Sequence, residues 1–312
     1  MKITIAIPNF NGENLLEKNL PNIIKAGADE VIVLDDCSKD SSLELLQKLQ
    51  NPNNKLQTNS KFKILKHKKN KGFIPSVNEL FIQAEGEMVI LLNNDVYVEK
   101  EFIKPLIKHF ENPKVFAVNL HEEGEGPAIS FWKDGFYEFK RGKEAEKIQK
   151  SAWASGGSAA FRKSVWQELG GFDDLFAPFY WEDIDISFRA IKVGYEILWE
   201  PGSRVKHDHE TTIKKAFSEK YIRWVQQRNQ LLYIWKNITD SKLKSEHRNG
   251  LIKRLFNRGA GYWIPFLWAV LKSHPGSHEV ADRILPIDPI ASLQNDGMKA
   301  RSDLDVINYA SS

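Results

Sequence analysis

Short apolar runs alternate with amphipathic segments along the first 95 residues of the chain. Four strands are predicted, at Ile3–Ile7, Val31–Leu34, Lys63–Leu65 and Met88–Leu92. The second and fourth runs are apolar throughout, which is typical of parallel strands that helices bury on both faces. Apolar residues at helical spacing predict helices between the strands, at 11–26, 38–49 and 75–84. This alternation predicts an α/β fold with a doubly wound, mostly parallel sheet flanked by helices.

The pattern is less regular beyond residue 95. Further helices are predicted at Phe102–Phe110, Trp166–Leu169 and Glu182–Val193, and strands at Val115–Leu120 and Ile197–Trp199. Trp153–Phe161, rich in small residues, is expected to run as a strand or to approach a ligand, with Gly156–Gly157 allowing close contact. Glu122–Gly126 is predicted to be an acidic loop, and Pro275–Ser312 to be rich in loops.

Composition restricts the class of protein. Apolar residues make up 42% and charged residues 27% of the 312 residues, as in globular proteins, and a net charge of +3 gives no indication of nucleic acid. Cys37 is the only cysteine, so an internal disulfide is excluded and a reducing compartment is favoured. The N-terminus lacks the apolar core of a signal peptide, and no apolar run is long enough to span a bilayer. A cytoplasmic protein is therefore expected.

Polar side chains follow the apolar runs at four places. The segments are Pro8–Gly12, Leu34–Ser38, Leu91–Asp95 and Trp181–Asp185. In an open α/β sheet, ligands bind in the crevice beyond the carboxyl ends of the strands. Carboxylates along that edge suit a diphosphate held through a divalent metal, together with a base for an attacking hydroxyl. This combination indicates transfer of a sugar from a nucleotide-activated donor.

Each acidic motif also has a purely structural interpretation. Asp35–Asp36 is expected either to accept a hydrogen bond from a nucleobase N–H or to form an Asx turn with a helix cap. Asp95 is expected to bind Mg²⁺ or Mn²⁺, or to belong to a polar turn. Glu182–Asp183 either supplies a general base, desolvated by Phe179–Trp181, or pairs favourably with a helix N-terminus. One imidazole of His207 and His209 is expected to complete a metal site, or both histidines lie in a surface loop.

Together these segments resemble an inverting glycosyltransferase of family 2 with the GT-A fold. The resemblance runs from Lys2 to Trp235 and is carried by motifs in the family's order: Pro8–Gly12, Leu34–Ser38, Asn70–Phe73 with Asn78, Leu92–Asp95, Gly170–Asp173, Tyr180–Asp185 with Arg189, His207, and Arg228–Asn229. The subgroup pattern is similar to that of rhamnosyltransferase-like enzymes that build bacterial surface polysaccharides. Neither G-x-G-x-x-G after the first strand nor a P-loop is present, so redox and P-loop chemistry are disfavoured.

The resemblance implies a role for each matching residue. Pro8, Asn9 and Phe10 would line the nucleobase pocket, and Asp36 would accept a hydrogen bond from the base. Asp183 would deprotonate the acceptor hydroxyl.

Glu182 would orient the acceptor. Asp95 would hold the metal and through it the diphosphate, and His207 is a candidate further element of the same site. Asn93 and Asn94 belong with the donor-binding residues. The family's metal motif is often Asp-x-Asp, and because Asn93 replaces its first acid, the metal would rest chiefly on Asp95.

A boundary is expected near residue 210. Residues 1–210 form the predicted GT-A catalytic domain, with a nucleotide-binding half (1–95) and an acceptor half (96–210). Residues 211–312 form a predicted helical extension, and 211–260 hold 12 Lys and Arg against 3 Asp and Glu, a balance of +9. This extension is expected either to pack on the catalytic core or, because Tyr262–Trp268 is aromatic-rich, to lie on an anionic membrane.

The sequence thus predicts a metal-dependent inverting glycosyltransferase that uses Mn²⁺ or Mg²⁺. Its expected partners are a nucleotide-diphosphate sugar donor, a glycan or lipid-linked acceptor, and an anionic membrane surface on the cytoplasmic face. The alternative is a non-catalytic nucleotide-sugar-binding or scaffold protein, which Asn93 favours and the intact Glu182–Asp183 disfavours. A sugar nucleotidyltransferase is disfavoured because Pro8–Gly12 contains no basic residue.

Overall fold

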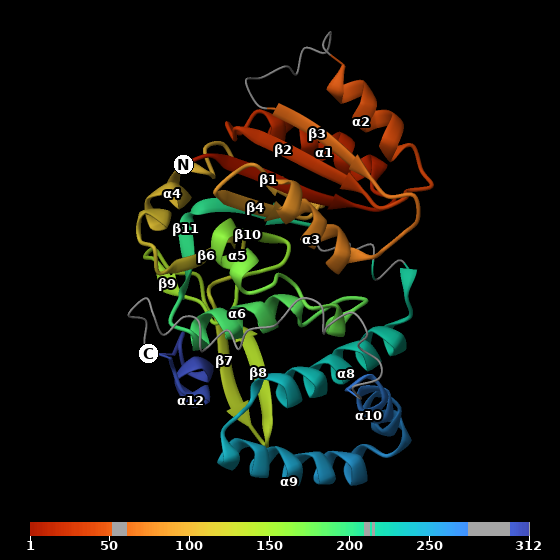
Figure 1. Cartoon of the computed structure of the whole chain (residues 1–312), viewed down its shortest axis with the longest axis vertical. Coiled ribbons are helices and arrows are strands. Elements are labelled where there is room, and N and C mark those ends of the chain that lie inside the picture. Colours follow the sequence, from red (N-terminus) through yellow and green to blue (C-terminus); the bar gives the residue numbers. More distant parts are fainter. Residues whose placement is uncertain (52–60, 209–212, 214–215, 274–299, 312) are drawn as a thin grey trace.

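A computed structural model describes residues 1–51, 61–208, 213, 216–273 and 300–311. Its main sheet has nine strands (Figure 1). In spatial order they are β3 (Lys61–Lys66), β2 (Glu30–Asp35), β1 (Ile3–Asn9), β4 (Met88–Leu92), β10 (Ser158–Arg162), β6 (Val115–Glu122), β11 (Glu196–His207) and β5 (Val96–Val98), with β9 (Gln149–Lys150) paired to β11. The first four strands are mutually parallel, and β10 is antiparallel to both of its neighbours.

The strand order places a topological switch point between β1 and β4. From β1 the chain proceeds outward through β2 and β3, and it then returns to pair β4 with the other side of β1. In doubly wound sheets the ligand crevice opens at such a point. The parallel register sets Asn9, at the end of β1, level with Asp35, at the end of β2.

Alternate side chains of the strands enter two separate cores on the two faces of the sheet. On β4, Val89 and Leu91 point to one core, whereas Met88, Ile90 and Leu92 point to the other. Such alternation of fully buried apolar residues explains why the β4 run is apolar throughout.

Helices cover both cores. One face is covered by α1 (Glu13–Ile24), α2 (Ser42–Gln50), α4 (Lys104–Ile107) and the 3₁₀ turn η1 (Lys108–Glu111). The other is covered by α3 (Phe73–Gln83), α5 (Lys163–Glu168), α6 (Glu182–Lys192) and α8 (Glu219–Asn237). The predicted α/β sheet flanked by helices is confirmed. The division of the chain at residue 210 stays a prediction.

The remaining elements extend the molecule beyond α6 and α8 (Figure 1). They are the hairpin β7 (Ala128–Lys133) and β8 (Phe136–Arg141), the helices α9 (Ser241–Arg258), α10 (Ala260–Ser273) and α12 (Asp303–Ile307), and the 3₁₀ turn η2 (Asp174–Phe176). The α9 helix contacts the hairpin turn, where His247 Nδ1 lies 2.8 Å from the Gly135 carbonyl oxygen. In the described part of the chain, no helix combines the length and the apolar character needed to cross a membrane.

Four details differ from the sequence prediction. The strand predicted at Ile197–Trp199 is the centre of the longer β11, because its end also pairs with β5. Glu122, predicted in a loop, is the last residue of β6 and is buried. The helix predicted at Phe102–Phe110 is divided into α4 and η1. Of the segment predicted to be rich in loops, 300–311 is described and contains α12, which Ser302 begins with a capping box.

Candidate active site

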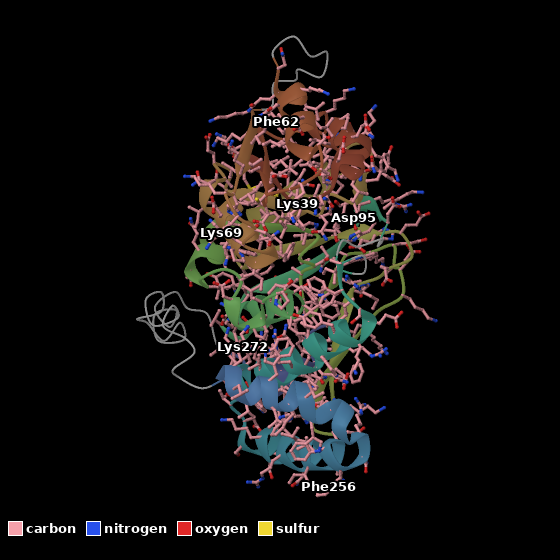
Figure 2. The ribbon with its side chains drawn as sticks, turned by 90° about the vertical axis from the view of Figure 1, so that its right-hand side faces the viewer. Lys39, Phe62, Lys69, Asp95, Phe256 and Lys272 are labelled. Carbon is pink, nitrogen blue, oxygen red and sulfur yellow. The ribbon has the colours of Figure 1, made fainter. Side chains whose placement is uncertain are left out.

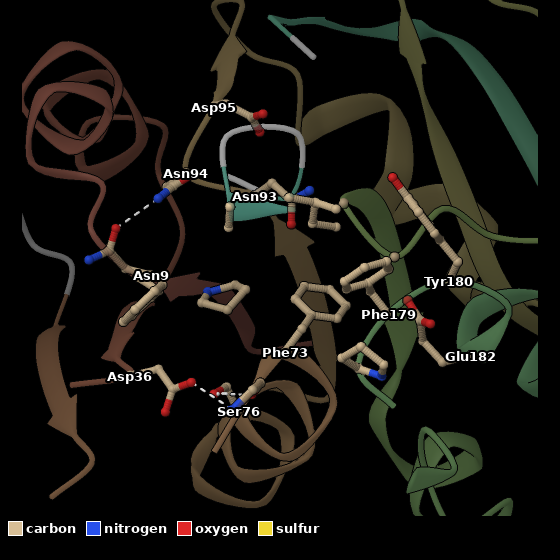
Figure 3. Close-up of a pocket in the computed structure, with 18 of the residues that line it drawn as sticks. Asn9, Asp36, Phe73, Ser76, Asn93, Asn94, Asp95, Phe179, Tyr180 and Glu182 are labelled. Carbon is tan, nitrogen blue, oxygen red and sulfur yellow. Dashed lines mark hydrogen bonds between the residues drawn. The ribbon is translucent and has the colours of Figure 1, made fainter. Parts of the chain in front are cut away.

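A pocket of about 560 Å³ opens at the switch point. One wall consists of the residues that follow β1, β2 and β4, and the opposite wall consists of residues 178–180 and the start of α6. Figure 3 shows Asn9, Asn94 and Asp36 on one side and Phe179, Tyr180 and Glu182 on the other. All the site residues predicted from the sequence line this one pocket: Pro8, Asn9, Phe10, Asp36, Asn93, Asn94, Asp95, Glu182, Asp183 and His207.

Asn9 and Asn94 are bonded to each other. Asn94 Nδ2 donates to Asn9 Oδ1 at 2.7 Å (Figure 3). Asn9 Nδ2 in turn donates to Asp35 Oδ1 at 3.1 Å. A Cβ on Gly12 would lie 2.1 Å from Asn94 Nδ2, so only glycine fits there. These amides therefore fasten the ends of β1, β2 and β4 together and fix the floor of the pocket.

The two neighbouring acids at the end of β2, Asp35 and Asp36, have different roles. Asp35 forms a turn, because its Oδ2 accepts from Ser38 N at 3.0 Å. Asp36 instead accepts from Lys71 N and Gly72 N, both at 2.8 Å, and lies 2.6 Å from His67 Nδ1. The structural interpretation thus applies to Asp35. Asp36 is buried, holds the 70–72 loop over the pocket, and faces the cavity itself.

Asp95, His207 and Glu122 form a buried row of ionisable groups. His207 Nε2 lies 3.0 Å from Asp95 Oδ1, and His207 Nδ1 lies 3.3 Å from Glu122 Oε1. Burial alone would lower the pKa of His207, but hydrogen bonds to Asp95 and Glu122 outweigh burial and raise the pKa to about 9. Burial opposes ionisation of Glu122 as well, yet hydrogen bonds from His207 and Ser158 bring its pKa down to about 2. His207 is thus a charged bridge between two carboxylates.

Asp95 and His207 from this row supply some of the ligands that a divalent metal needs. Asp95 offers a carboxylate oxygen and His207 an imidazole nitrogen from neighbouring positions on the pocket wall. Glu122, behind His207, is placed as the outer carboxylate that commonly orients a metal-binding imidazole. Within the described residues, no three His, Cys, Asp or Glu side chains form a ready-made metal cluster. Two protein ligands suit a metal that takes its remaining oxygens from a bound diphosphate. His209 lies outside the described residues.

Two carboxylates meet at the N-terminus of α6. Asp183 is partly exposed, and its oxygens accept from Gly156 N at 3.1 Å and Ile184 N at 2.8 Å. Glu182 is buried, and within the described chain its Oε2 has no hydrogen-bond partner. Burial raises the pKa of both carboxyl groups, and the Asp183 charge raises the pKa of Glu182 further. A base and a neutral acid can therefore coexist here.

The loop before α6 is held in a strained shape. Tyr180 and Trp181 have φ values of 71° and 80°, where non-glycine residues are uncommon. Asn229 Nδ2, on α8, donates to the carbonyl oxygens of Phe179 and Tyr180 at 3.0 and 2.8 Å. Arg228 donates to the Ala177 carbonyl oxygen at 2.5 Å. The Arg228–Asn229 motif thus acts indirectly, by presenting Glu182 and Asp183 to the pocket.

Asp185 is structural, although it belongs to the same acidic motif. It is fully buried and accepts from Arg189 Nε at 2.8 Å, Lys236 Nζ at 2.9 Å and Asn237 Nδ2 at 2.8 Å. Burial would raise its pKa, but the charges of Arg189 and Lys236 lower it. These bonds tie α6 to α8. The Asn237 side chain is occupied in this contact.

Gly156 and Gly157 lie beside the strand-end residues, as the expected close approach requires. Gly157 O accepts from Asn93 N at 2.9 Å, and a Cβ on Gly157 would lie 2.5 Å from Asn93 Nδ2. The sequence did not predict the role of Glu122, nor that Phe217 lines the pocket. Their only signal was apolar or acidic character, which many surface loops share.

Comparisons with known proteins agree with this geometry. The family model described as "Glycosyl transferase family 2" matches residues 4–170, and one described as "Glycosyl transferase family group 2" matches residues 88–292. The O-antigen chain rhamnosyltransferase RfbN of Salmonella typhimurium is 27% identical over 234 residues, which cover 70% of this chain and 69% of RfbN. Poly(ribitol-phosphate) beta-N-acetylglucosaminyltransferase TarS of Staphylococcus aureus is 32% identical over 112 residues, 33% of this chain and 18% of TarS.

Solved structures share the fold. GalNAc-T7, crystallised with UDP, GalNAc and Mn²⁺, superimposes with a TM-score of 0.62 at 17% identity, over 88% of this chain and 58% of the other. The mannosyltransferase PcManGT of Pyrobaculum calidifontis, in complex with GDP-Man and Mn²⁺, gives a TM-score of 0.56 at 17% identity, over 94% of this chain and 79% of the other.

Proposed function

The chain belongs to glycosyl transferase family 2 and is a glycosyltransferase, and we propose that it moves a sugar, with inversion and with the help of a divalent metal, from a nucleotide-diphosphate sugar to a hydroxyl group. The proposed acceptor is a glycan or a lipid-linked glycan in the synthesis of a bacterial surface polysaccharide. The similarity to the O-antigen rhamnosyltransferase supports that setting.

The observation that carries the proposal is the pairing of two walls in one pocket. Polar residues at the ends of β1, β2 and β4 face the paired carboxylates at the start of α6. A donor lying across the strand ends would present its sugar toward those carboxylates. A nucleotide-binding scaffold needs only the first wall, so the second wall favours catalysis.

Donor recognition is assigned to the strand-end wall. Asp36 Oδ2 already accepts from Gly72 N, and a carboxylate oxygen has a second lone pair for a nucleobase N–H. Pro8 and Phe10 offer apolar surface to the base, and Asn93 offers an amide to the ribose. Asn9 and Asn94 support this wall through their mutual hydrogen bond.

Asp95 and His207 are proposed to hold Mn²⁺ or Mg²⁺. When bound, such a metal neutralises charge that gathers on the leaving diphosphate. His207 must lose its proton before it can bind a metal, so Glu122 would then accept a hydrogen bond from the Nδ1–H of the neutral ring. Asn93, in place of an acid, leaves the site with less negative charge than an Asp-x-Asp pair would give.

Asp183 is proposed as the general base. The acceptor oxygen forms a bond to the anomeric carbon while its proton passes to Asp183, and the bond from that carbon to the diphosphate oxygen breaks on the opposite face. The products are the inverted glycoside and the nucleoside diphosphate. The raised pKa of Asp183 makes it a better proton acceptor. Glu182, in its neutral form, is placed to orient the acceptor hydroxyl.

The test is an assay that offers a panel of nucleotide sugars and glycan acceptors to the protein. It measures sugar transfer through the release of nucleoside diphosphate. The anomeric configuration of the product, measured by NMR, should be opposite to that of the donor. Retention of configuration would contradict a single displacement by an activated hydroxyl. Donor binding without any release, across the panel, would favour the scaffold alternative.

A further inference from the structure

Helix α10 is apolar on two opposite sides, although only one of them packs against other described residues. Tyr262 and Ala269 are buried, and Trp268 packs near Tyr221 of α8 with ring centroids 6.0 Å apart. The opposite side carries Trp263, Ile264, Leu267 and Leu271 at helical spacing, all 44–72% exposed. A helix that is apolar on all sides is normally buried on all sides.

Helix α9 adds to this exposed surface. Ile252 is 49% exposed, and Phe256, one turn later, is 83% exposed, the highest value among the large apolar side chains of the described residues. Figure 2 shows Phe256 at the end of the molecule opposite Phe62. We call the exposed apolar set the α9–α10 surface: Ile252, Phe256, Trp263, Ile264, Leu267 and Leu271. Single exposed apolar residues are ordinary, but four at helical spacing on one side of α10, with two more on the adjoining α9, indicate an interaction site.

Basic residues are concentrated on α9, and α10 adds only Lys272. Residues 241–273 hold seven Lys and Arg and one Glu, a balance of 7 − 1 = +6, while the rest of the chain is 3 − 6 = −3. Lys242, Lys244, Arg248 and Lys253 are exposed on α9. The ion pairs found among the described residues involve none of these four. Positive charge beside exposed apolar side chains complements an anionic lipid surface, since the headgroups attract the cations and the acyl boundary accepts the apolar groups.

Aromatic contacts connect this surface to the pocket. Trp268, on the inner side of α10, lies 4.0 Å below the Arg228 guanidinium. Its neighbour Tyr221 stacks on Phe217 with centroids 5.2 Å apart, and Phe217 lines the pocket beside Phe179. The inner side of α10 is therefore connected to the pocket wall that carries Phe179 and Phe217, while its outer side stays exposed.

We propose that α9 and α10 dock side-on to an anionic bilayer, so that the acceptor glycan reaches the pocket while attached to a membrane lipid. Because α10 packs along α8, only its outer side can meet the bilayer. The choice of a lipid-linked acceptor rests on the proposed function, but the docking itself does not.

The test is co-sedimentation of the full chain with phosphatidylcholine vesicles and with vesicles of equal parts phosphatidylcholine and phosphatidylglycerol, without donor or metal. Binding to the anionic vesicles alone is expected, and it should weaken as salt rises. The double variant Leu267→Ser with Leu271→Ser should weaken binding by about tenfold or more, because both exposed side chains lose apolar contact. Ile82→Ser, an equally exposed apolar residue on α3, should leave binding unchanged.

Charge is tested in the same assay. Arg248→Glu with Lys253→Glu should weaken binding to anionic vesicles, whereas Lys100→Glu with Lys104→Glu, also exposed, should not. Equal binding to both vesicle types, or none, would overturn the proposal. A dimer in solution that Leu267→Ser with Leu271→Ser dissociates, without vesicle binding, would also overturn it by assigning the surface to a second copy. Nucleotide-sugar binding without vesicles tests the pocket separately, so failure of docking leaves the proposed function intact.

Discussion

Replacing Asp183 with asparagine should remove most turnover and leave donor binding intact. The substitution keeps the size of the side chain and removes its capacity to take a proton. General-base help is typically worth roughly 10²- to 10⁴-fold in rate, which corresponds to ~2.7–5.5 kcal/mol of transition-state stabilisation. The loss should therefore appear in kcat, with little change in the donor's dissociation constant.

The structural cost of the same substitution can be bounded from its contacts. Asp183 accepts one backbone N–H on each oxygen, from Gly156 and Ile184. An asparagine can accept only one of them, because its amide nitrogen is a donor that faces the other N–H. An unpaired buried donor costs about 1–3 kcal/mol, and the partial exposure of Asp183 favours the lower end. The variant should thus stay folded.

The assay compares turnover, donor affinity by calorimetry and urea unfolding for wild type and Asp183→Asn. The control away from the pocket is Asp303→Asn, because Asp303 also accepts two backbone N–H groups, from Thr239 and Asp240 on its Oδ2, and its Oδ1 pairs with Lys192. The control should lose stability but keep the turnover of its folded fraction. Full turnover in folded Asp183→Asn would refute the assignment of the base, and loss of donor binding would place Asp183 in the donor site.

Three further predictions concern the surrounding residues. Asp185→Asn should lower the free energy of unfolding by about 3 kcal/mol in urea titrations, since Arg189 loses its buried carboxylate partner while Lys236 keeps its contact with Asp173, and a much smaller loss would mean that water already screens the contact. Gly157→Ala should raise KM for the donor and leave Tm almost unchanged, because the new methyl group displaces the Asn93 side chain. An unchanged KM would remove Asn93 from donor recognition. The Glu122–His207 pair should stabilise the metal-free fold most between about pH 4.5 and 6.5. Its contribution should fall as acid protonates Glu122 toward its pKa of about 2, and also as His207 loses its proton between about pH 6.5 and 9. In Glu122→Gln, Tm should lose the fall toward acid pH and show a weaker fall above pH 6.5, because His207 keeps Asp95 as a partner, and an identical profile would disprove the coupling.

The parallel half of the fold was predictable because its signals are local. Fully apolar runs such as Met88–Leu92 leave no face for water, so a strand buried on both faces suits them. The β7–β8 hairpin was missed, although Asp134–Gly135 between two alternating runs is a strong hairpin signal. Both residues have the positive φ that such a turn requires.

The pocket was predictable to the extent that strand ends determine it. Asp36 and Asp95 follow strands, and parallel register then brings strand ends to one edge. Glu122 was placed in a loop because nothing in its sequence neighbourhood records that β11 pairs with β6 and positions His207 beside it. The structural role of Asp185 was likewise invisible, since its partners on α8 lie about fifty residues away in sequence.

Donor binding to the strand-end wall is the central claim, and a thermal-shift screen of nucleotide sugars tests it most directly. The screen compares wild type with Asp95→Ala, each with and without Mn²⁺ or Mg²⁺. A ligand that binds the native state raises the melting temperature by mass action. We predict that one donor stabilises the wild type only when metal is present, and that Asp95→Ala abolishes this shift. A well-folded wild type that no donor stabilises, or a donor shift that Asp95→Ala leaves unchanged, would contradict the account.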